Sequence, residues 1–270
     1  MKKDYRNNIR KYFVLCTIVG IMLISIWIAL CLAKTGNVIL ILSLFVMLVL
    51  HKLIVRIIAN KTLFSVLVKE LDANSFNAIV RDKRFKMPIV YKTIAAISIG
   101  DYQTAVKIAT KQIDDPKSKI QFRYYCLSVL ARAYFELRDF EKLNLVIKKY
   151  DELHVLYPSK DVNTLNSIWD YYRYFLECNF EACKAICKTK ENTLKKKSSD
   201  NNYYIIINDF YYAVVCHSAG NMEEAARVFD KIIHTAPKIH LSNISKRYLD
   251  SINSASELTV FDEFIPEEKY

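Results

Sequence analysis

Residues 213–237 read AVVCHSAGNMEEAARVFDKIIHTAP, and this stretch predicts two helices joined by a tight turn. Gly220 suits a helix end that needs a positive φ, and the side chain of Asn221 can cap the helix that follows. Apolar residues recur at helical spacing on both sides of the turn. We therefore expect a helical hairpin, which Pro237 closes.

Three further turns along the chain have the same order of residues as the turn at Gly220. They are Gly100-Asp101-Tyr102, Arg138-Asp139-Phe140 and Cys178-Asn179-Phe180. In each, an Asp or Asn that can cap a helix comes directly before an aromatic residue. The corresponding residues one turn into the next helices are Ala105, Leu143, Cys183 and Ala225, which lie 38, 40 and 42 residues apart. A period near 40 with paired helices predicts an α-solenoid of about four hairpins.

Two of these hairpins resemble the tetratricopeptide repeat (TPR) family. In the hairpin at 213–237, Ala213 and Ala225 stand where the family has small residues that let two helices pack closely, and Phe229 and Pro237 complete the pattern. The hairpin that contains ARAYFELRDF, residues 131–140, is also similar. The resemblance covers about residues 88–237.

The third hairpin departs from the family pattern. Tyr171 stands where the family has a small residue, and Cys183 and Cys187 take the small and aromatic core positions. We therefore expect the two helices of this hairpin to splay, or the register of the repeat to slip.

The chain as a whole is predicted to be all-α, because four Gly and five Pro leave few places for the turns of a sheet-rich fold. We place the solenoid at 88–258, with a capping helix over 239–258 and an acidic tail at 259–270. Residues 61–87 are predicted to form an amphipathic stalk and a linking helix. Within them, Asp72 is expected to cap a short helix that ends near Lys83, and Pro88, directly after them, marks the start of the next helix.

Residues 1–60 are predicted to form a transmembrane helix hairpin, at about 12–33 and 36–57. The first of these spans has 22 residues without a charge, which suffices to cross about 30 Å of hydrocarbon. A cleaved signal peptide is disfavoured, because its apolar region is shorter. The connecting loop holds Lys34, whereas the flanks hold Lys2, Lys3, Arg6, Arg10, Lys11, Lys52, Arg56 and Lys61. This distribution predicts a multi-pass protein of the cell membrane with both termini in the cytoplasm.

The net charge of +11 suits an anionic partner, but Lys and Arg are spread over many segments. A solvated surface beside anionic lipid explains this better than nucleic acid, for which the chain has no recognised motif. The seven Cys are an odd number, and two of them lie within the first apolar span, which fits a reducing compartment.

The sequence predicts no enzyme, no cofactor and no metal. Cys178, Cys183, Cys187 and Cys216 permit a metal site, but Cys183 and Cys187 fall on core positions, where Cys acts as a small apolar residue. The five His form no ligand set, and no glycine-rich phosphate loop is present.

The resemblance implies a partner-binding groove, because TPR proteins bind ligands on the concave face that the first helices of the hairpins form. The residues it assigns to this groove are Tyr125, Arg132, Phe135, Tyr172, Phe175, Phe210 and His217. In the alternative, neighbouring helices or the apolar segment 258–265 cover these side chains.

We therefore expect a membrane-anchored scaffold or adaptor that binds a protein or peptide on the cytoplasmic face of the membrane. Its other partner is the lipid bilayer, through the two transmembrane helices. A second possibility is an accessory subunit of a membrane transporter or envelope-assembly complex that docks through its transmembrane hairpin. A homodimer through a coiled-coil stalk is a further alternative to packing of the stalk on the first repeat.

Overall fold

The computed structural model describes residues 18–22, 24, 25, 27, 28, 49, 65–82, 87–157, 162–197 and 202–254. The side chains of 162–166 and 197 are not described. The chain divides into two compact units, Met1–Glu70 and Leu71–Tyr270.

In the first unit, the described residues of 18–28 and residues 65–68 are helical. Most of the two predicted spans, 12–33 and 36–57, lies outside the described residues. Within the residues that are described, none of the helices has the length and apolar character needed to cross a membrane.

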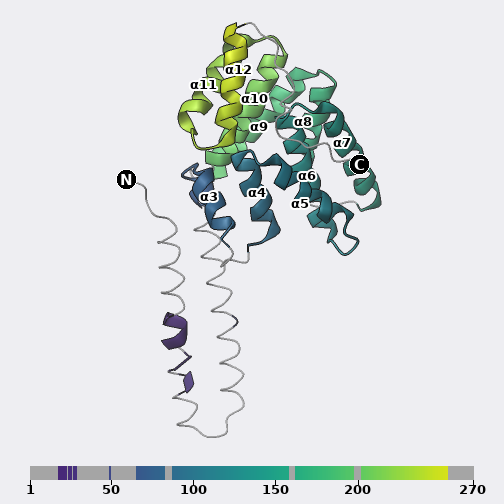
Figure 1. Ribbon diagram of the computed structural model, residues 1–270. Coiled ribbons are helices and arrows are strands. Elements are labelled where there is room, and N and C mark those ends of the chain that lie inside the picture. The colour runs from purple at the N-terminus through teal and green to yellow at the C-terminus, as the bar shows by residue number, and fades with distance from the viewer. Residues whose placement is uncertain are drawn as a thin grey trace. The chain divides into compact units, whose positions relative to one another are not determined.

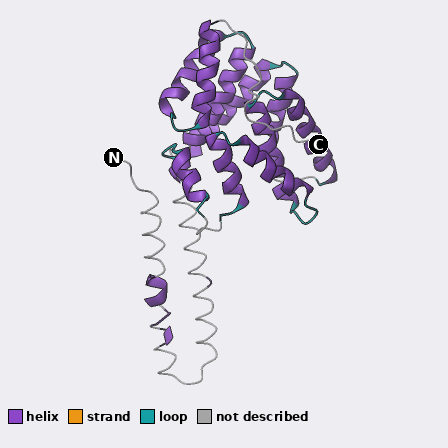
Figure 2. Cartoon of the chain, viewed as in Figure 1, coloured by secondary structure: helices purple, strands orange, loops and turns teal. Residues whose placement is uncertain are grey.

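The second unit consists of helices, and no strand occurs among its described residues (Figure 2), so the prediction of an all-α fold is confirmed. In chain order the helices are α3 (Ala73–Val80), α4 (Ile89–Ile99), α5 (Tyr102–Asp114), α6 (Ile120–Glu136), α7 (Phe140–Leu156), α8 (Val162–Leu176), α9 (Phe180–Lys197), α10 (Asn202–Ser218), α11 (Met222–Thr235) and α12 (His240–Ser254).

Asp72 caps α3 by accepting a hydrogen bond from the Ser75 backbone N–H at 3.0 Å, and Pro88 directly precedes α4. The helix after Asp72 ends at Val80 instead of near Lys83.

Four turns of one kind join α4 to α5, α6 to α7, α8 to α9 and α10 to α11. Each begins with a residue of positive φ, and these are Gly100 (83°), Arg138 (61°), Cys178 (58°) and Gly220 (79°). The next residue caps the following helix, since the side chains of Asp101, Asp139, Asn179 and Asn221 each accept a hydrogen bond from the backbone N–H three residues on. The backbone N–H of each capping residue donates to a carbonyl five residues back, which closes the preceding helix. The capping signals in the sequence thus predicted all four hairpins at the correct residues.

The hairpins follow one another as a helical-repeat-like array, in which neighbouring helices pack side by side (Figure 1). Small or apolar side chains lie where the two helices of a hairpin meet. Ala105, Leu143, Cys183 and Ala225, which the period aligned, are all fully buried.

The third hairpin keeps the same turn, although Tyr171 replaces a small residue. The Tyr171 ring is buried and stacks on that of Tyr211 with centroids 5.2 Å apart, and its hydroxyl donates to the Tyr211 backbone carbonyl at 2.8 Å. The Cys183 thiol lies against the Tyr171 backbone, with its sulfur 3.5 Å from the carbonyl oxygen. A large residue on α8 is therefore accommodated by a small one on α9, and the register does not slip at Cys178.

The last described helix, α12, packs on α11 and also contacts α4 and α10. Lys238, just before α12, forms an ion pair with Asp72 at 2.9 Å, and His240 makes an edge-to-face contact with the ring of Tyr102 at 5.5 Å. Elements from the two ends of this unit are thus in direct contact. Residues 255–258 of the predicted capping helix lie outside the described part.

Candidate functional site

The structure does not expose the aromatic residues that we assigned to a groove. Phe135, Tyr172, Phe175 and Phe210 are buried. The ring of Phe135 lies 5.0–5.6 Å from the rings of Tyr171, Tyr172, Phe175 and Tyr211. Bulky rings from α6, α8 and α10 therefore fill the space between these helices. This arrangement corrects the expectation of an open apolar groove and agrees with the alternative that neighbouring helices cover these side chains.

The remaining groove candidates are half-buried and lie in separate places. The Tyr125 hydroxyl donates to the Val90 carbonyl at 3.1 Å and shares a hydrogen bond of 2.7 Å with the Thr93 hydroxyl. His217 packs edge-to-face on the ring of Tyr248, 5.1 Å away, and burial together with nearby Arg138 lowers its pKa. These contacts are all internal to the helical array.

Arg132 belongs to a buried polar network. Its Nε donates to Glu136 Oε1 at 2.6 Å, and its Nη1 donates to the Tyr203 hydroxyl at 3.1 Å. The Tyr102 hydroxyl donates to Glu136 Oε2 at 2.7 Å, and the Tyr203 hydroxyl lies 2.8 Å from that of Ser98. The network therefore joins α4, α5, α6 and α10.

Glu136 is only 1% exposed, so this network holds a buried ion pair. Burial opposes the charge of Arg132, but the carboxylate of Glu136 outweighs it and raises the guanidinium pKa above its ordinary value. Burial and the same carboxylate raise the pKa of Tyr102. The sequence held one signal of this pair, namely opposite charges four residues apart in a stretch, 124–136, that has no other charged residue.

The cysteines of the third hairpin are core residues. Cys183 and Cys187 are buried, and burial raises the pKa of each thiol to about 12. Such thiols stay protonated at neutral pH, whereas metal ligands and nucleophiles are thiolates. No cluster of three or more His, Cys, Asp or Glu that could hold a metal ion occurs in the described residues.

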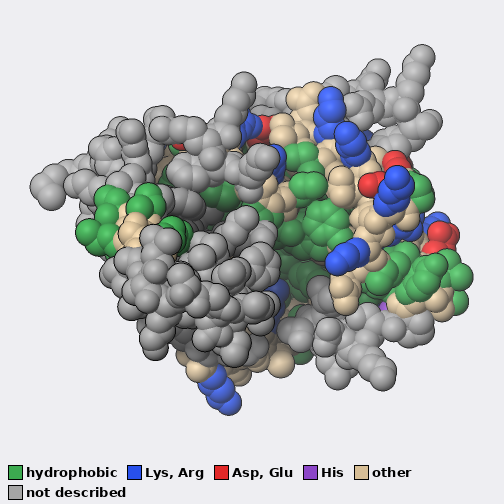
Figure 3. Space-filling view, turned by 90° about the horizontal axis from the view of Figure 1, so that it is seen from below, with side chains coloured by type: hydrophobic (Ala, Val, Ile, Leu, Met, Phe, Trp, Pro, Cys, Tyr) green, Lys and Arg blue, Asp and Glu red, His purple; other side chains and the backbone are tan. Residues whose placement is uncertain are grey.

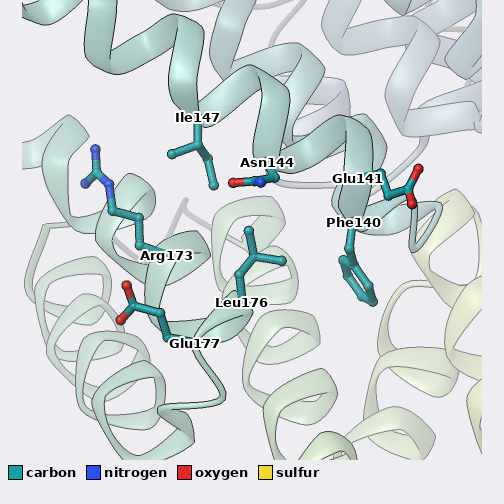
Figure 4. Close-up of a pocket in the computed structure, with 7 residues that line it drawn as sticks. All are labelled: Phe140, Glu141, Asn144, Ile147, Arg173, Leu176 and Glu177. Carbon is teal, nitrogen blue, oxygen red and sulfur yellow. The ribbon is translucent and has the colours of Figure 1, made fainter.

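A surface cleft of about 510 Å³ lies between α7 and α8, that is, between the second and third hairpins (Figure 4). Its lining residues are Phe140, Glu141, Asn144 and Ile147 from α7, and Arg173, Leu176 and Glu177 from α8 and the turn after it. Ile147 and Asn144 point from α7 toward Leu176 and Arg173 on the facing helix. No pattern in the sequence indicates this cleft, because its residues carry no motif and meet only through packing of successive hairpins.

Contacts on both sides of the cleft join α7 to α8. On the side of Arg173, the rings of Tyr150 and Trp169 stack with centroids 4.1 Å apart, and the Arg173 guanidinium pairs with Asp151. On the side of Phe140, the rings of Phe140 and Phe175 are 5.5 Å apart. The cleft lies between these contacts, where the side chains of α7 and α8 leave space.

The charge of the cleft differs in sign from that of the chain. Arg173 also pairs with Asp170 at 2.9 Å, so two carboxylates neutralise its guanidinium. Glu141 and Glu177 are exposed, and neither has an ion-pair partner among the residues that the structure describes. Elsewhere, Lys and Arg side chains occur in several separate places on the face shown in Figure 3. The cleft is thus a locally acidic site on a chain of net charge +11.

Comparison with known proteins found no similar family, curated protein or solved structure.

Proposed function

We propose that this chain is a membrane-anchored scaffold whose TPR-like array of helical hairpins binds a protein partner on the cytoplasmic face of the cell membrane. The observation that carries the proposal is the cleft between α7 and α8 on an array of consecutive hairpins. Stacked helical hairpins offer extended surfaces, and such surfaces serve mainly for protein binding.

The cleft provides both kinds of contact that a protein partner needs. Ile147, Phe140 and Leu176 supply apolar surface, and Glu141, Asn144 and Glu177 supply polar groups at its rim. Its volume lies within the range of about 300–1,000 Å³ that is usual for ligand pockets. Because the aromatic residues between α6, α8 and α10 are buried, this surface replaces the interior groove as the proposed binding site.

The described residues of the first unit support an apolar anchor. Ile18, Ile21, Met22, Ile28 and Val49 are exposed by 43–61%, although they are large and apolar. The Ser25 hydroxyl donates to the Ile21 carbonyl at 2.9 Å, which satisfies its hydrogen bond within the helix, as a lipid environment requires. Together with the distribution of Lys and Arg, these features favour two spans that leave the array in the cytoplasm.

Photocrosslinking in living cells tests this function. A photoreactive amino acid at Asn144 of the full-length protein should crosslink another protein, whereas one at Glu223, exposed on α11, should not. A third position, Met22, reports on the predicted first span. Crosslinks to a membrane protein from Met22 and none from Asn144 would overturn the scaffold and favour an accessory subunit that docks through its membrane hairpin.

A further inference from the structure

The floor of the cleft between α7 and α8 is apolar and can accept one or two apolar side chains of a bound segment. Ile147 is 5% exposed, and Phe140 and Leu176 are half-buried around it. From Glu141 to Ile147 the cleft follows α7 for six residues, which is about 9 Å at 1.5 Å per residue. This length matches roughly three residues of an extended segment or two turns of a helix.

The rim of the cleft presents two carboxylates, Glu141 and Glu177, that have no ion-pair partner among the described residues. Among the described lining residues Arg173 is the one cation, and its guanidinium pairs with Asp151 and Asp170. Glu141 and Glu177, which lie on opposite sides of the lining residues in Figure 4, carry exposed carboxylates. Electrostatic complementarity between surfaces favours partners of opposite charge and disfavours those of like charge.

We propose that this cleft binds a basic amphipathic segment of a partner protein. An apolar side chain of the segment packs against Phe140, Ile147 and Leu176, and flanking Lys or Arg side chains pair with Glu141 and Glu177. The inference rests on the proposed scaffold function and adds the chemistry of the partner.

The negative charge of the cleft also disfavours binding of the chain's own C-terminal segment. Residues 258–265, LTVFDEFI, are apolar enough to enter a cleft, but they carry Asp262 and Glu263. These would meet the like charges of Glu141 and Glu177, which disfavours binding. The N-terminal residues 1–11 are basic, so the experiment includes their deletion as an arm.

The test uses the full-length protein in neutral detergent and measures fluorescence anisotropy of labelled peptides. The probe is an amphipathic peptide of about twelve residues built from Lys and Leu, and the matched peptide has Glu in place of each Lys. We expect the Lys peptide to bind and the Glu peptide not to bind. Glu177→Lys should weaken binding on the order of tenfold, whereas Glu223→Lys, the same charge change on exposed α11, should leave it unchanged.

Four results would overturn the inference. Equal binding of the two peptides would remove the charge preference, and equal losses in Glu177→Lys and Glu223→Lys would show attraction to the whole molecule. Tighter binding after deletion of residues 2–11 would show that the chain's own N-terminus occupies the cleft. If the Lys peptide fails to bind while Asn144 still crosslinks a protein in cells, the scaffold function stands and the proposed partner chemistry is wrong.

Discussion

The ring of His240, at the start of α12, lies directly against the backbone of Gly100, at the end of α4. A Cβ atom at residue 100 would come within 2.4 Å of His240 Nδ1, which is closer than two such atoms can approach. Gly100 also has a φ of 83°, a conformation that L residues with a side chain disfavour. This position therefore needs glycine both for the turn and for the contact between the two ends of the array.

Gly100→Ala should destabilise the protein far more than Gly220→Ala. Both residues have positive φ, which costs an alanine about 1–2 kcal/mol, but nothing lies within 4 Å of a Cβ at Gly220. At Gly100 the contact with His240 adds overpacking of about 1–3 kcal/mol. Urea unfolding of the full-length variants, each also carrying Trp27→Phe so that Trp169 is the one tryptophan, measures the difference by fluorescence. Equal losses would contradict the tight approach of α12 to α4.

Cys178→Gly should stabilise the protein by about 1 kcal/mol. Cys178 is exposed and has a φ of 58°, so glycine relieves backbone strain at this turn without removing a buried side chain. Arg138→Gly serves as the comparison, because Arg138 has the same kind of φ but also lies over the ring of Tyr248 at 5.7 Å. We expect little or no gain there. A loss of stability in Cys178→Gly would show that this turn is not strained.

The four hairpin turns could be predicted from the sequence because their signals are local. A residue that ends one helix and an Asp or Asn that caps the next stand side by side, and the hydrogen bonds that they make span only a few residues. The burial of Phe135 and Phe210 could not be predicted in the same way. Helical periodicity identifies an apolar face, but the packing of several hairpins decides whether another helix or solvent meets that face.

The buried network and the cleft were missed for related reasons. Glu136 meets Tyr102 from another helix, and Tyr203 comes from a helix much further along the chain. Asn144 and Leu176 become neighbours only where the second hairpin packs on the third. Such contacts depend on tertiary structure, for which a single sequence without an internal motif gives no pattern.

Removing one partner of the buried ion pair should cost more than replacing both. Glu136→Leu leaves Arg132 buried without its carboxylate, for which a loss of about 3–5 kcal/mol is typical. The double variant Arg132→Met/Glu136→Leu removes both charges, so much of that stability should return. Unfolding free energies of Glu136→Leu, of Arg132→Met and of the double variant give the coupling free energy between the two side chains. Additive losses would contradict a direct interaction between these side chains.

Stability should fall as the pH decreases from about 7 to 5. Burial lowers the pKa of His217 and of His240. At His217 nearby Arg138 acts in the same direction, and at His240 burial outweighs the opposing carboxylate of Glu136, with a further lowering from Arg247. Since the ordinary value is about 6.5, the unfolded chain binds protons below that pH which the folded protein does not bind. The loss of unfolding free energy is therefore absent above pH 7. It grows as the pH falls toward the pKa values that the two histidines have in the folded protein, by at most about 1.4 kcal/mol per pH unit for each histidine.

A variant with His217→Gln and His240→Gln should lose much of this pH dependence, while the exposed control His234→Gln should retain it. Melting temperatures at pH 7.5 and 5.5 provide the comparison. Asp72 does not interfere, because hydrogen bonds from Lys238 and Ser75 outweigh its burial and lower its pKa, so that its contribution is lost only below about pH 4. An unchanged pH response in the double variant would assign the acid sensitivity to other groups.

Both termini of the chain should face the cytoplasm, with a short loop near Asn37 on the other side of the membrane. The prediction follows from Lys and Arg on the flanks of residues 12–33 and 36–57, because positively charged segments stay on the cytoplasmic side. In a variant without the native cysteines, Asn37→Cys should react with a membrane-impermeant thiol reagent in intact cells. Ser254→Cys, at the end of α12, should react only after the cells are opened. The reverse pattern would place the helical array outside the cytoplasm, and labelling of both sites in intact cells would contradict a pair of membrane spans.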